Sequence, residues 1–200
     1  MELLGELASN TDRVREHAQR ASGIVKSLVA HGQSGSGRRE TVDLREIVGR
    51  VVNVSFAGSD IRPVWVPGAE PVRVEADAQA LDRALVNLVT NARQAVADRA
   101  HRDDTFRAVV CVALDCVDGY ALLRVMDNGP GIDDDLRDRV FEPFFSTRPT
   151  GEGTGLGLPL ARQIVVDGHG GALDLEPSEM GATFAIRLPL VAGASGDGAA

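Results

Sequence analysis

The sequence has only two cysteines, no excess of positive charge and no long apolar run, and each absence excludes a class of protein. The net charge of −8 argues against nucleic-acid binding, which requires a basic surface. Cys111 and Cys116 lie five residues apart in one expected strand, so they point to opposite faces and should not form a disulfide. Free cysteines fit a reducing cytosol. Because no segment resembles a membrane span or a signal peptide, we expect a cytoplasmic location.

Glycine, by contrast, is concentrated at 153–157, where Gly153, Gly155 and Gly157 alternate with Thr154 and Leu156. An apolar segment with helical periodicity follows at 160–166. Glycine permits close approach to the backbone, and a helix N-terminus presents free N–H groups and partial positive charge. The combination predicts a phosphate-binding loop, but one with neither dinucleotide-fingerprint spacing nor a Walker ending. A flexible surface loop is the alternative.

Two asparagines occupy one face of an expected helix at 78–96. Asn87 and Asn91 are four residues apart, so their side chains lie one above the other. Two amides on one face can hold a hydrated magnesium ion through carbonyl oxygens and waters. The alternative is a pair of solvated asparagines.

Asp127 ends an apolar run at 120–126 that reads as a strand, and Asn-Gly-Pro-Gly-Ile follows it. A carboxylate in this position can be directed into a pocket and accept a hydrogen bond from a base amine. An ordinary Asn-Gly turn is the alternative.

Three of the six phenylalanines fall within 141–145, in the segment Phe-Glu-Pro-Phe-Phe-Ser-Thr. They predict either a cluster that packs a loop on the core or an anchor for a mobile segment at 147–155. That segment contains four hinge or turn residues: Pro149, Gly151, Gly153 and Gly155.

In this order and spacing, the four segments resemble the ATP-binding catalytic domain of bacterial sensor histidine kinases, a superfamily shared with gyrase, Hsp90 and MutL. The resemblance covers about 42–190. It implies that Asn91 binds magnesium and that Asn87 lies beside it near the phosphates of ATP. It also implies that Asp127 accepts from the adenine amine, inside a pocket wall formed by Gly129, Gly131 and Ile132.

The same resemblance implies a phosphate end with a lid that is mobile without nucleotide. The residues implied near the phosphates are Thr147, Gly153, Thr154, Gly155, Leu156 and Gly157. Arg148 stands where the family often has a basic lid residue, and the resemblance gives it a catalytic role together with Asn87. Arginine keeps the charge of the usual lysine but changes the geometry. Pro159 replaces a serine often found there, which the first turn of a helix tolerates.

Asn87 indicates a kinase and not a hydrolase. Hydrolytic members of the superfamily carry a glutamate four residues before the metal asparagine, where it acts as general base on water. An amide cannot take up that proton, and a positioned base contributes roughly 10²–10⁴ in rate. Gln94-Ala95 resembles the nitrogen-regulation type of kinase.

None of the four histidines, His17, His31, His101 and His169, has the context of a phosphoacceptor, which is followed by Glu and soon by Asn-Pro or Thr-Pro. We expect His169 to be a turn residue after the helix at 160–166. Apolar residues at 4–28 follow an unbroken heptad spacing, and 16–28 resembles the second helix of the dimerisation and phosphotransfer hairpin. The histidine-bearing helix would then precede Met1. A simple coiled-coil dimeriser is the alternative.

The expected fold class is α/β (α+β), a two-layer α/β sandwich with one mixed sheet, preceded by a long N-terminal helix. Strands are expected at the start of 41–54 and at 64–66, 72–74, 106–117, 120–126, 172–175 and 183–188, and helices at the end of 41–54 and at 78–96, 133–140 and 160–166. The predicted domains are a helical arm at 1–31, a linker at 32–40, the ATP-binding kinase catalytic domain at 41–190 and a disordered tail at 191–200.

The predicted function is transfer of the γ-phosphoryl group of MgATP to a histidine on a phosphoacceptor helix outside this chain, for signalling to a response regulator. The cofactors are ATP and Mg²⁺. The partners are the histidine-bearing helix or hairpin, the response regulator and a second copy through the N-terminal helix, with no nucleic acid. Self-phosphorylation is not expected, and a full-length relative could be membrane-anchored. The alternative is a non-catalytic nucleotide-binding or interaction module that docks on a kinase or response regulator.

Overall fold

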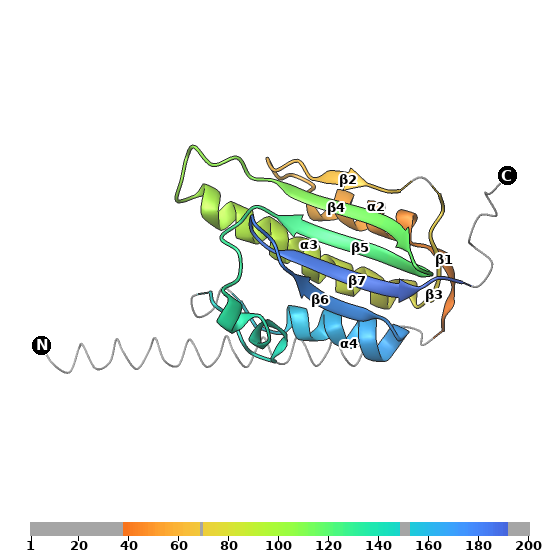
Figure 1. Ribbon diagram of the computed structural model, residues 1–200. Coiled ribbons are helices and arrows are strands. Elements are labelled where there is room, and N and C mark those ends of the chain that lie inside the picture. The colour runs from red at the N-terminus through yellow and green to blue at the C-terminus, as the bar shows by residue number, and fades with distance from the viewer. Residues whose placement is uncertain (1–37, 69, 149–152, 192–200) are drawn as a thin grey trace, which may run out of the picture.

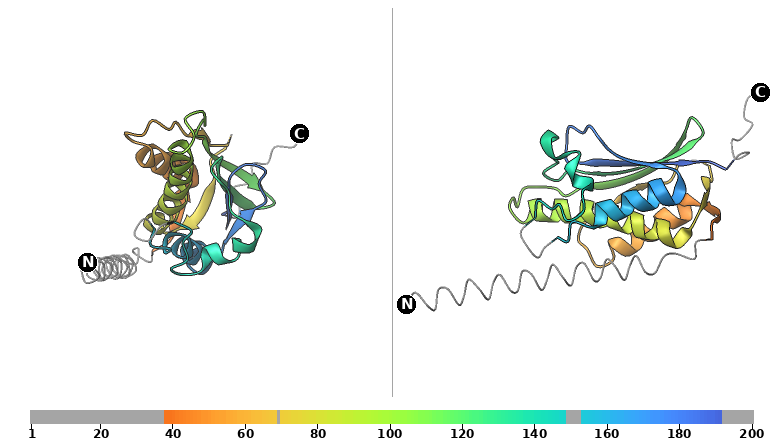
Figure 2. Two further views of the ribbon diagram at one scale, coloured as in Figure 1. Left: turned by 90° about the vertical axis from the view of Figure 1, so that its left-hand side faces the viewer. Right: turned by 90° about the horizontal axis from the view of Figure 1, so that it is seen from below.

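The computed structural model describes residues 38–68, 70–148 and 153–191. A five-stranded sheet has the order β2 (Val64–Val66), β4 (Val110–Val117), β5 (Tyr120–Asp127), β7 (Thr183–Pro189) and β6 (Ala172–Glu176). The β2–β4 pair is parallel and the other pairs are antiparallel. Three helices, α2 (Leu44–Ser55), α3 (Ala78–Ala100) and α4 (Gly157–His169), form the second layer (Figures 1 and 2). The predicted sandwich with a mixed sheet is confirmed. The predicted N-terminal helix, the C-terminal tail from 192 onward and residues 149–152 of the predicted hinge segment lie outside the described residues.

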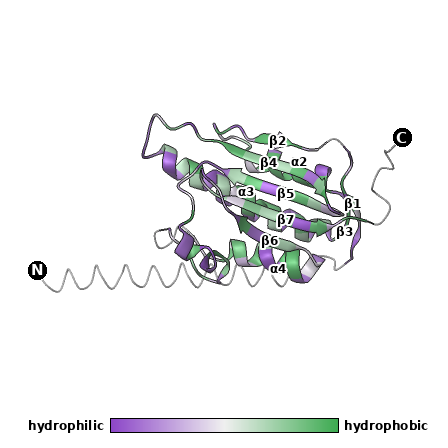
Figure 3. Cartoon of the chain, in the orientation of Figure 1, coloured by the Kyte–Doolittle hydropathy of each residue, from purple (hydrophilic) through white to green (hydrophobic). Residues whose placement is uncertain are grey.

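Alternation of side chains along the strands explains which face of the sheet carries the helices. On β5, Ala121, Leu123 and Val125 are buried against the helical layer together with the apolar stripe of α3. Ala84 is buried in that stripe together with the six residues that the helical periodicity predicts: Leu81, Leu85, Leu88, Val89, Ala92 and Val96. In the hydropathy view, green hydrophobic stretches run along the strands of the sheet and are interrupted by purple hydrophilic positions (Figure 3).

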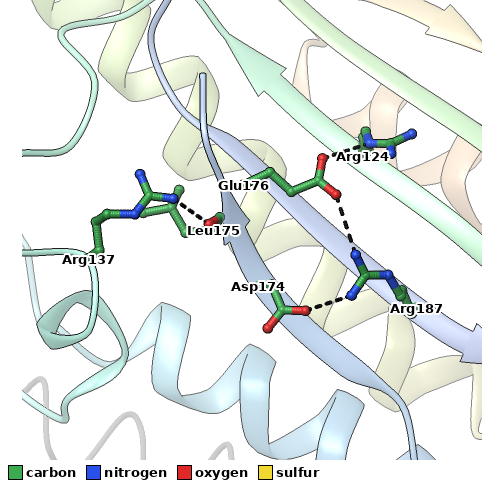
Figure 4. Close-up of polar contacts among 6 residues, drawn as sticks. All are labelled: Arg124, Arg137, Asp174, Leu175, Glu176 and Arg187. Atoms are coloured by element: carbon green, nitrogen blue, oxygen red, sulfur yellow. Dashed lines mark hydrogen bonds and ion pairs between the residues drawn. The ribbon is translucent and has the colours of Figure 1, made fainter. Parts of the chain in front are cut away.

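The opposite face of the sheet carries charged residues across three neighbouring strands (Figure 4). Nε of Arg124 on β5 lies 2.8 Å from Oε2 of Glu176 on β6. Arg187 on β7 lies between Asp174 and Glu176, with nitrogen–oxygen distances of 3.1 Å and 3.6 Å. These partly exposed ion pairs mark this side of the sheet as a hydrated surface.

A second, two-stranded sheet forms beside the first, which the expected single sheet did not include. The strand β1 (Glu40–Asp43) pairs antiparallel with β3 (Arg73–Ala76). Val74 also forms an isolated bridge with Leu190. The strand expected at 72–74 therefore begins one residue later and continues to Ala76, because its partner β1 extends that far.

Several element boundaries differ from the sequence predictions. The segment expected as a helix at 133–140 forms two short 3-10 helices, η1 (Asp134–Leu136) and η2 (Arg139–Phe141). Val140 is the one buried residue in the two short helices. Without an apolar stripe to pack on the core, the segment does not form a longer helix. Strand β4 begins at Val110 and not at 106, because its ladder with β5 starts at the Val110–Asp127 pair.

The helices α3 and α4 are each longer than expected. Asp77 caps α3 by accepting from the backbone N–H groups of Gln79 and Ala80, and the helix continues four residues past 96 to Ala100. Helix α4 begins at Gly157, three residues before 160, and ends at His169, before Gly170 in the left-handed conformation with φ of 65°.

His169 is not the turn residue that the sequence predicts. It is the last residue of α4, and only 6% of it is exposed. Its Nε2 accepts from the backbone N–H of Asp77 at 3.0 Å, and its Nδ1 lies 2.7 Å from the carbonyl oxygen of Ile164. The side chain therefore joins the end of α4 to the start of α3, a role that its position next to Gly170 did not reveal.

Cys111 and Cys116 are both free, in agreement with the sequence prediction. Within the part of the chain that the structure describes, no helix is long and apolar enough to span a membrane.

Candidate nucleotide site

The asparagine face of α3 meets the first residue of α4. Asn87 and Asn91 are both half-buried. A Cβ atom placed on Gly157 would lie 3.5 Å from Oδ1 of Asn87, so the two residues are close neighbours with room for little more than a methyl group between them. The packing of α3 against α4 thus brings together two segments that are 70 residues apart in sequence.

The N-terminus of α4 is not capped by a side chain. Its N-cap residue is Leu156, and Pro159 lies in the first turn, where proline is tolerated as expected. The free N–H groups and the helix dipole at such an end favour an anion. This geometry agrees with the phosphate-binding loop that the sequence predicts.

Gly155 joins the glycine loop to the phenylalanine segment. It has a φ of 63°, and a Cβ atom here would lie 2.5 Å from the carbonyl carbon of Phe144. Its carbonyl oxygen accepts from the backbone N–H of Phe144 at 2.9 Å. Phe144 itself has a φ of 68°. The two loops therefore pack closely at Gly155. A larger residue there would have a strained backbone conformation and would clash with Phe144.

The three phenylalanines have different surroundings. Phe141 packs edge-to-face on Phe184 of the core, with ring centroids 6.2 Å apart. Phe145 lies under the guanidinium of Arg139, whereas Phe144 is 55% exposed. Phe141 thus packs the loop on the core, as the first reading predicts, whereas Phe144 remains at the surface. Anchoring of a mobile segment at 147–155 stays a prediction.

Asp127 lies at the end of β5 and is 7% exposed. Its Oδ1 accepts from the backbone N–H groups of Gly129 at 2.8 Å and Ala182 at 3.3 Å. Burial raises the pKa of this carboxyl group, and the two backbone hydrogen bonds oppose the rise. Gly181 has a φ of 65°, and a Cβ atom there would lie 2.0 Å from the carbonyl oxygen of Asp127. The loop before β7 thus passes so close to Asp127 that only glycine fits at position 181.

The turn after Asp127 packs against α3. A Cβ atom on Gly129 would lie 3.0 Å from Cβ of Ala95, one turn beyond Asn91. Gly131 has a φ of 80° and faces the backbone of Gly181, and Ile132 is half-buried against the core. The residues expected to form a pocket wall therefore lie between α3 and the loop before β7.

Arg148 lies on α3. Its Nη1 donates to Oε1 of Gln94 at 2.6 Å, and its Nε is 3.9 Å from Oδ2 of Asp98. Thr147 and Thr154 are exposed near it, and a Cβ atom on Gly153 would lie 2.8 Å from Oγ of Ser146.

Sequence reasoning missed the roles of Gln94 and Asp98 as partners of Arg148. One signal was present, because Asn87, Asn91, Gln94 and Asp98 follow a 4-3-4 spacing that places them on one face of α3.

Among the described residues, no group of three or more His, Cys, Asp or Glu side chains is arranged to hold a metal ion. The side-chain donor near Gly157 is the amide group of Asn87, and Asn91 lies one turn further along the same helix. This set fits magnesium, which accepts oxygen ligands and retains waters or substrate phosphates in the remaining positions.

A groove of 520 Å³ lies along the outer side of α4. Its lining includes Phe141, Pro143, Leu160 and Val166, and it includes neither Asn91 nor Asp127. Its lining does include Leu156, one of the predicted nucleotide residues, so the start of α4 borders both the groove and the predicted site.

Comparisons with known proteins agree with this arrangement. The family model for histidine kinase-, DNA gyrase B-, and HSP90-like ATPases matches residues 76–192. The sensor kinase CckA of Brucella abortus is 31% identical over 185 residues, which cover 88% of this chain and 20% of CckA. The chain thus spans a fifth of the length of this curated relative.

Two solved structures are similar to the fold. The mycobacterial sensor histidine kinase MprB has a TM-score of 0.64 at 33% identity, covering 76% of this chain and 97% of the solved one. The histidine kinase ThkA in complex with the response regulator protein TrrA has a TM-score of 0.68 at 25% identity, covering 89% of this chain and 49% of that chain. Since the family model covers more than half of the sequence, this chain belongs to the histidine kinase-, DNA gyrase B-, and HSP90-like ATPases, as a catalytic domain of the sensor histidine kinase type.

Proposed function

We propose that this domain transfers the γ-phosphoryl group of MgATP to a histidine on a separate phosphoacceptor helix, and so signals to a response regulator. The observation that carries the proposal is the proximity of Asn87 to Gly157, which places the asparagine face of α3 beside the uncapped start of α4. Gly129 contacts Ala95, eight residues further along the same helix. Eight helical residues span about 12 Å, a length on the scale of a nucleoside triphosphate.

Asp127 is the residue that would read the base. Both of its backbone hydrogen bonds use Oδ1, which leaves Oδ2 as the oxygen for an exocyclic amine. Adenine presents a donor amine at the position where guanine has an acceptor oxygen. The carboxylate would therefore favour ATP over GTP, within a wall formed by Gly129, Gly131 and Ile132.

The phosphates would lie at the start of α4, beside Gly153, Gly155 and Gly157. A helix dipole contributes only about 0.3–1 kcal/mol at an exposed end, so further positive charge is needed. Arg148 is the nearby side chain that we assign to this task. Magnesium, when bound, would neutralise phosphate charge. Asn91 would hold it through its amide oxygen, and Asn87 would orient the neighbouring phosphates.

Asn87 also separates transfer from hydrolysis. An amide at this position cannot accept a proton from water, so the site lacks the base of a hydrolase. ATP would then remain intact until an imidazole nitrogen of a phosphoacceptor helix approaches the γ-phosphate. The alternative of a non-catalytic module has weaker support, because the relatives are named as sensor kinases.

A reconstitution assay tests this function. The chain is incubated with ATP labelled at the γ-phosphate and with a separate histidine-bearing hairpin from a related sensor kinase. We expect acid-labile phosphate on the hairpin and none on this chain, and no label on a hairpin whose acceptor histidine is replaced by glutamine. ATP binding without transfer to any such hairpin would favour the non-catalytic module. Label on this chain that disappears in His17→Ala or His31→Ala would make one of those histidines the acceptor.

A further inference from the structure

Arg99, in the last turn of α3, holds the turn that follows Asp127. Its Nη1 donates to the carbonyl oxygen of Asn128 at 3.0 Å and to that of Gly129 at 3.1 Å. Hydrogen bonds from a charged donor are stronger than neutral ones, and two carbonyls on one nitrogen restrain the turn in two places. The segment beside Asp127 is therefore tied by hydrogen bonds to the helix that carries Asn87 and Asn91.

The side chain of Arg99 is itself held in place. Its guanidinium carbon lies 4.4 Å from the centre of the Phe106 ring, in a cation–π contact. Phe106 reaches this position because the chain turns back after α3, with Asp103 accepting from Thr105 and from the backbone N–H of Phe106. The aromatic ring thus restricts an arginine that is otherwise exposed.

The other restraints on the turn come from the sheet. Asn128 donates from Nδ2 to the carbonyl of Arg107 and accepts at Oδ1 from the N–H of Val109. Asp127 bonds to Ala182 on the other side. These contacts fix the turn relative to the strands, whereas Arg99 fixes it relative to α3.

We propose that Arg99 is a positioning residue for the base end of the nucleotide site. It would set the distance between Asp127, which reads the base, and the asparagines of α3, which hold the phosphate end. This role deepens the proposed function and rests on it. Arg99 acts through the backbone of Asn128 and Gly129 and does not touch the nucleotide.

The test compares Arg99→Met, which keeps an apolar stem against Phe106 but removes both hydrogen bonds, with Arg99→Lys, which keeps a charged donor. Arg102→Met, at an exposed arginine in the following turn, is the matched control. Affinities are measured for MgATP and MgGTP, and for magnesium tripolyphosphate, which has no base. Amide hydrogen exchange of the segment 127–132 is followed without nucleotide.

We expect Arg99→Met to weaken ATP binding about ten-fold, to reduce the preference for ATP over GTP, and to leave tripolyphosphate binding unchanged. Arg99→Lys should recover part of the loss, and Arg102→Met should match the wild type. Exchange in 127–132 should quicken in Arg99→Met alone. An equal loss for ATP and tripolyphosphate would overturn the positioning role in favour of a general structural one, as would unchanged ATP affinity in Arg99→Met.

If the wild type binds no ATP, the proposed function fails, and the role of Arg99 at a nucleotide site fails with it. Faster exchange in Arg99→Met would in that case show a purely structural clamp. If the wild type binds ATP and Arg99→Met binds it equally well, only the positioning role is overturned. The two failures are therefore distinguishable.

Discussion

At the scale of single residues, Asp127 combines two requirements that oppose each other. Its carboxyl group is buried at the end of a strand, where desolvation disfavours the charge, yet reading a base amine needs an ionised acceptor. The backbone N–H groups of Gly129 and Ala182 compensate in part by donating to Oδ1. The proposed role of Asp127 in base recognition would thus come at some cost in stability.

Asp127→Asn should separate the two requirements. The amide oxygen can keep both backbone hydrogen bonds, so the melting temperature at neutral pH should equal or exceed that of the wild type. The amide nitrogen would replace an acceptor with a donor, so ATP affinity should fall by about ten-fold or more in a titration. Unchanged affinity in a folded variant would remove Asp127 from base recognition.

The same residue predicts a pH dependence. Because the pKa is raised in the folded protein, the folded state holds this proton more firmly than the unfolded state. The contribution of Asp127 to stability should therefore decrease as the pH rises from the ordinary aspartate value of 3.8 through the raised value. Denaturant titrations across this window should show a stability advantage of Asp127→Asn that grows with pH. An advantage that shrinks would mean that the carboxylate is stabilised in the fold.

At the scale of elements, α3 organises the site from a single face. It carries Asn87 and Asn91, packs against Gly129 through Ala95, and binds Arg148 through Gln94 and Asp98. Its far end is joined to α4 through His169 and the N–H of Asp77. Helix α3 therefore carries residues at both ends of the proposed site.

Asp98→Asn should raise ATP affinity. In the structure Asp98 is paired with Arg148, and a carboxylate competes with phosphate for the same guanidinium. This pair is partly exposed and worth about 0–1 kcal/mol, so the gain should be at most about five-fold in a binding titration. Gln94→Glu, which adds a carboxylate next to Arg148, should have the opposite effect. Weaker binding in Asp98→Asn would show that Asp98 supports the nucleotide.

His169→Leu should destabilise the junction of α3 and α4. The substitution leaves the buried N–H of Asp77 without its acceptor, which costs about 1–3 kcal/mol. For a chain of this size the melting temperature should fall by about 2–10 °C, measured by circular dichroism. His169→Gln retains an acceptor and should lose less. Equal melting of all three proteins would show that the hydrogen bond contributes nothing measurable.

At the scale of the whole molecule, ligand binding should increase the free energy of unfolding and so raise the melting temperature. A ligand that binds only the folded state stabilises it by about 2.7 kcal/mol at one hundred times Kd. MgATP should then raise the melting temperature by roughly 5–10 °C. MgGTP should do much less. Equal shifts from both nucleotides would argue against base recognition at Asp127.

Local patterns were sufficient for much of the fold, whereas the members of the site stay predictions. The helical period of α3 identified the buried stripe, and the turns with glycine marked the ends of β5 and the start of α4. The family resemblance, carried by four segments, added the expectation that these segments come together in one nucleotide site. Domain boundaries and residue roles stay predictions.

What local patterns did not provide are contacts between distant residues. The pairing of β1 with β3, the burial of His169, and the contacts of Arg99 and Arg148 join positions 29 to 92 residues apart. Such contacts depend on how the layers pack, which no single window of sequence contains. Element ends failed for a related reason, since β4 begins where its partner strand begins to pair.

The strand β2 has a consequence for how copies of this domain behave at high concentration. It forms one border of the five-stranded sheet, and its three residues lie between Pro63 and Pro67. Proline has no N–H to donate, so a foreign strand arriving at this border would find a very short row of donors and acceptors. Although Val64 and Val66 are about half exposed, the flanking prolines should prevent growth of the sheet into another molecule. The domain can thus leave this edge uncovered without templating aggregation.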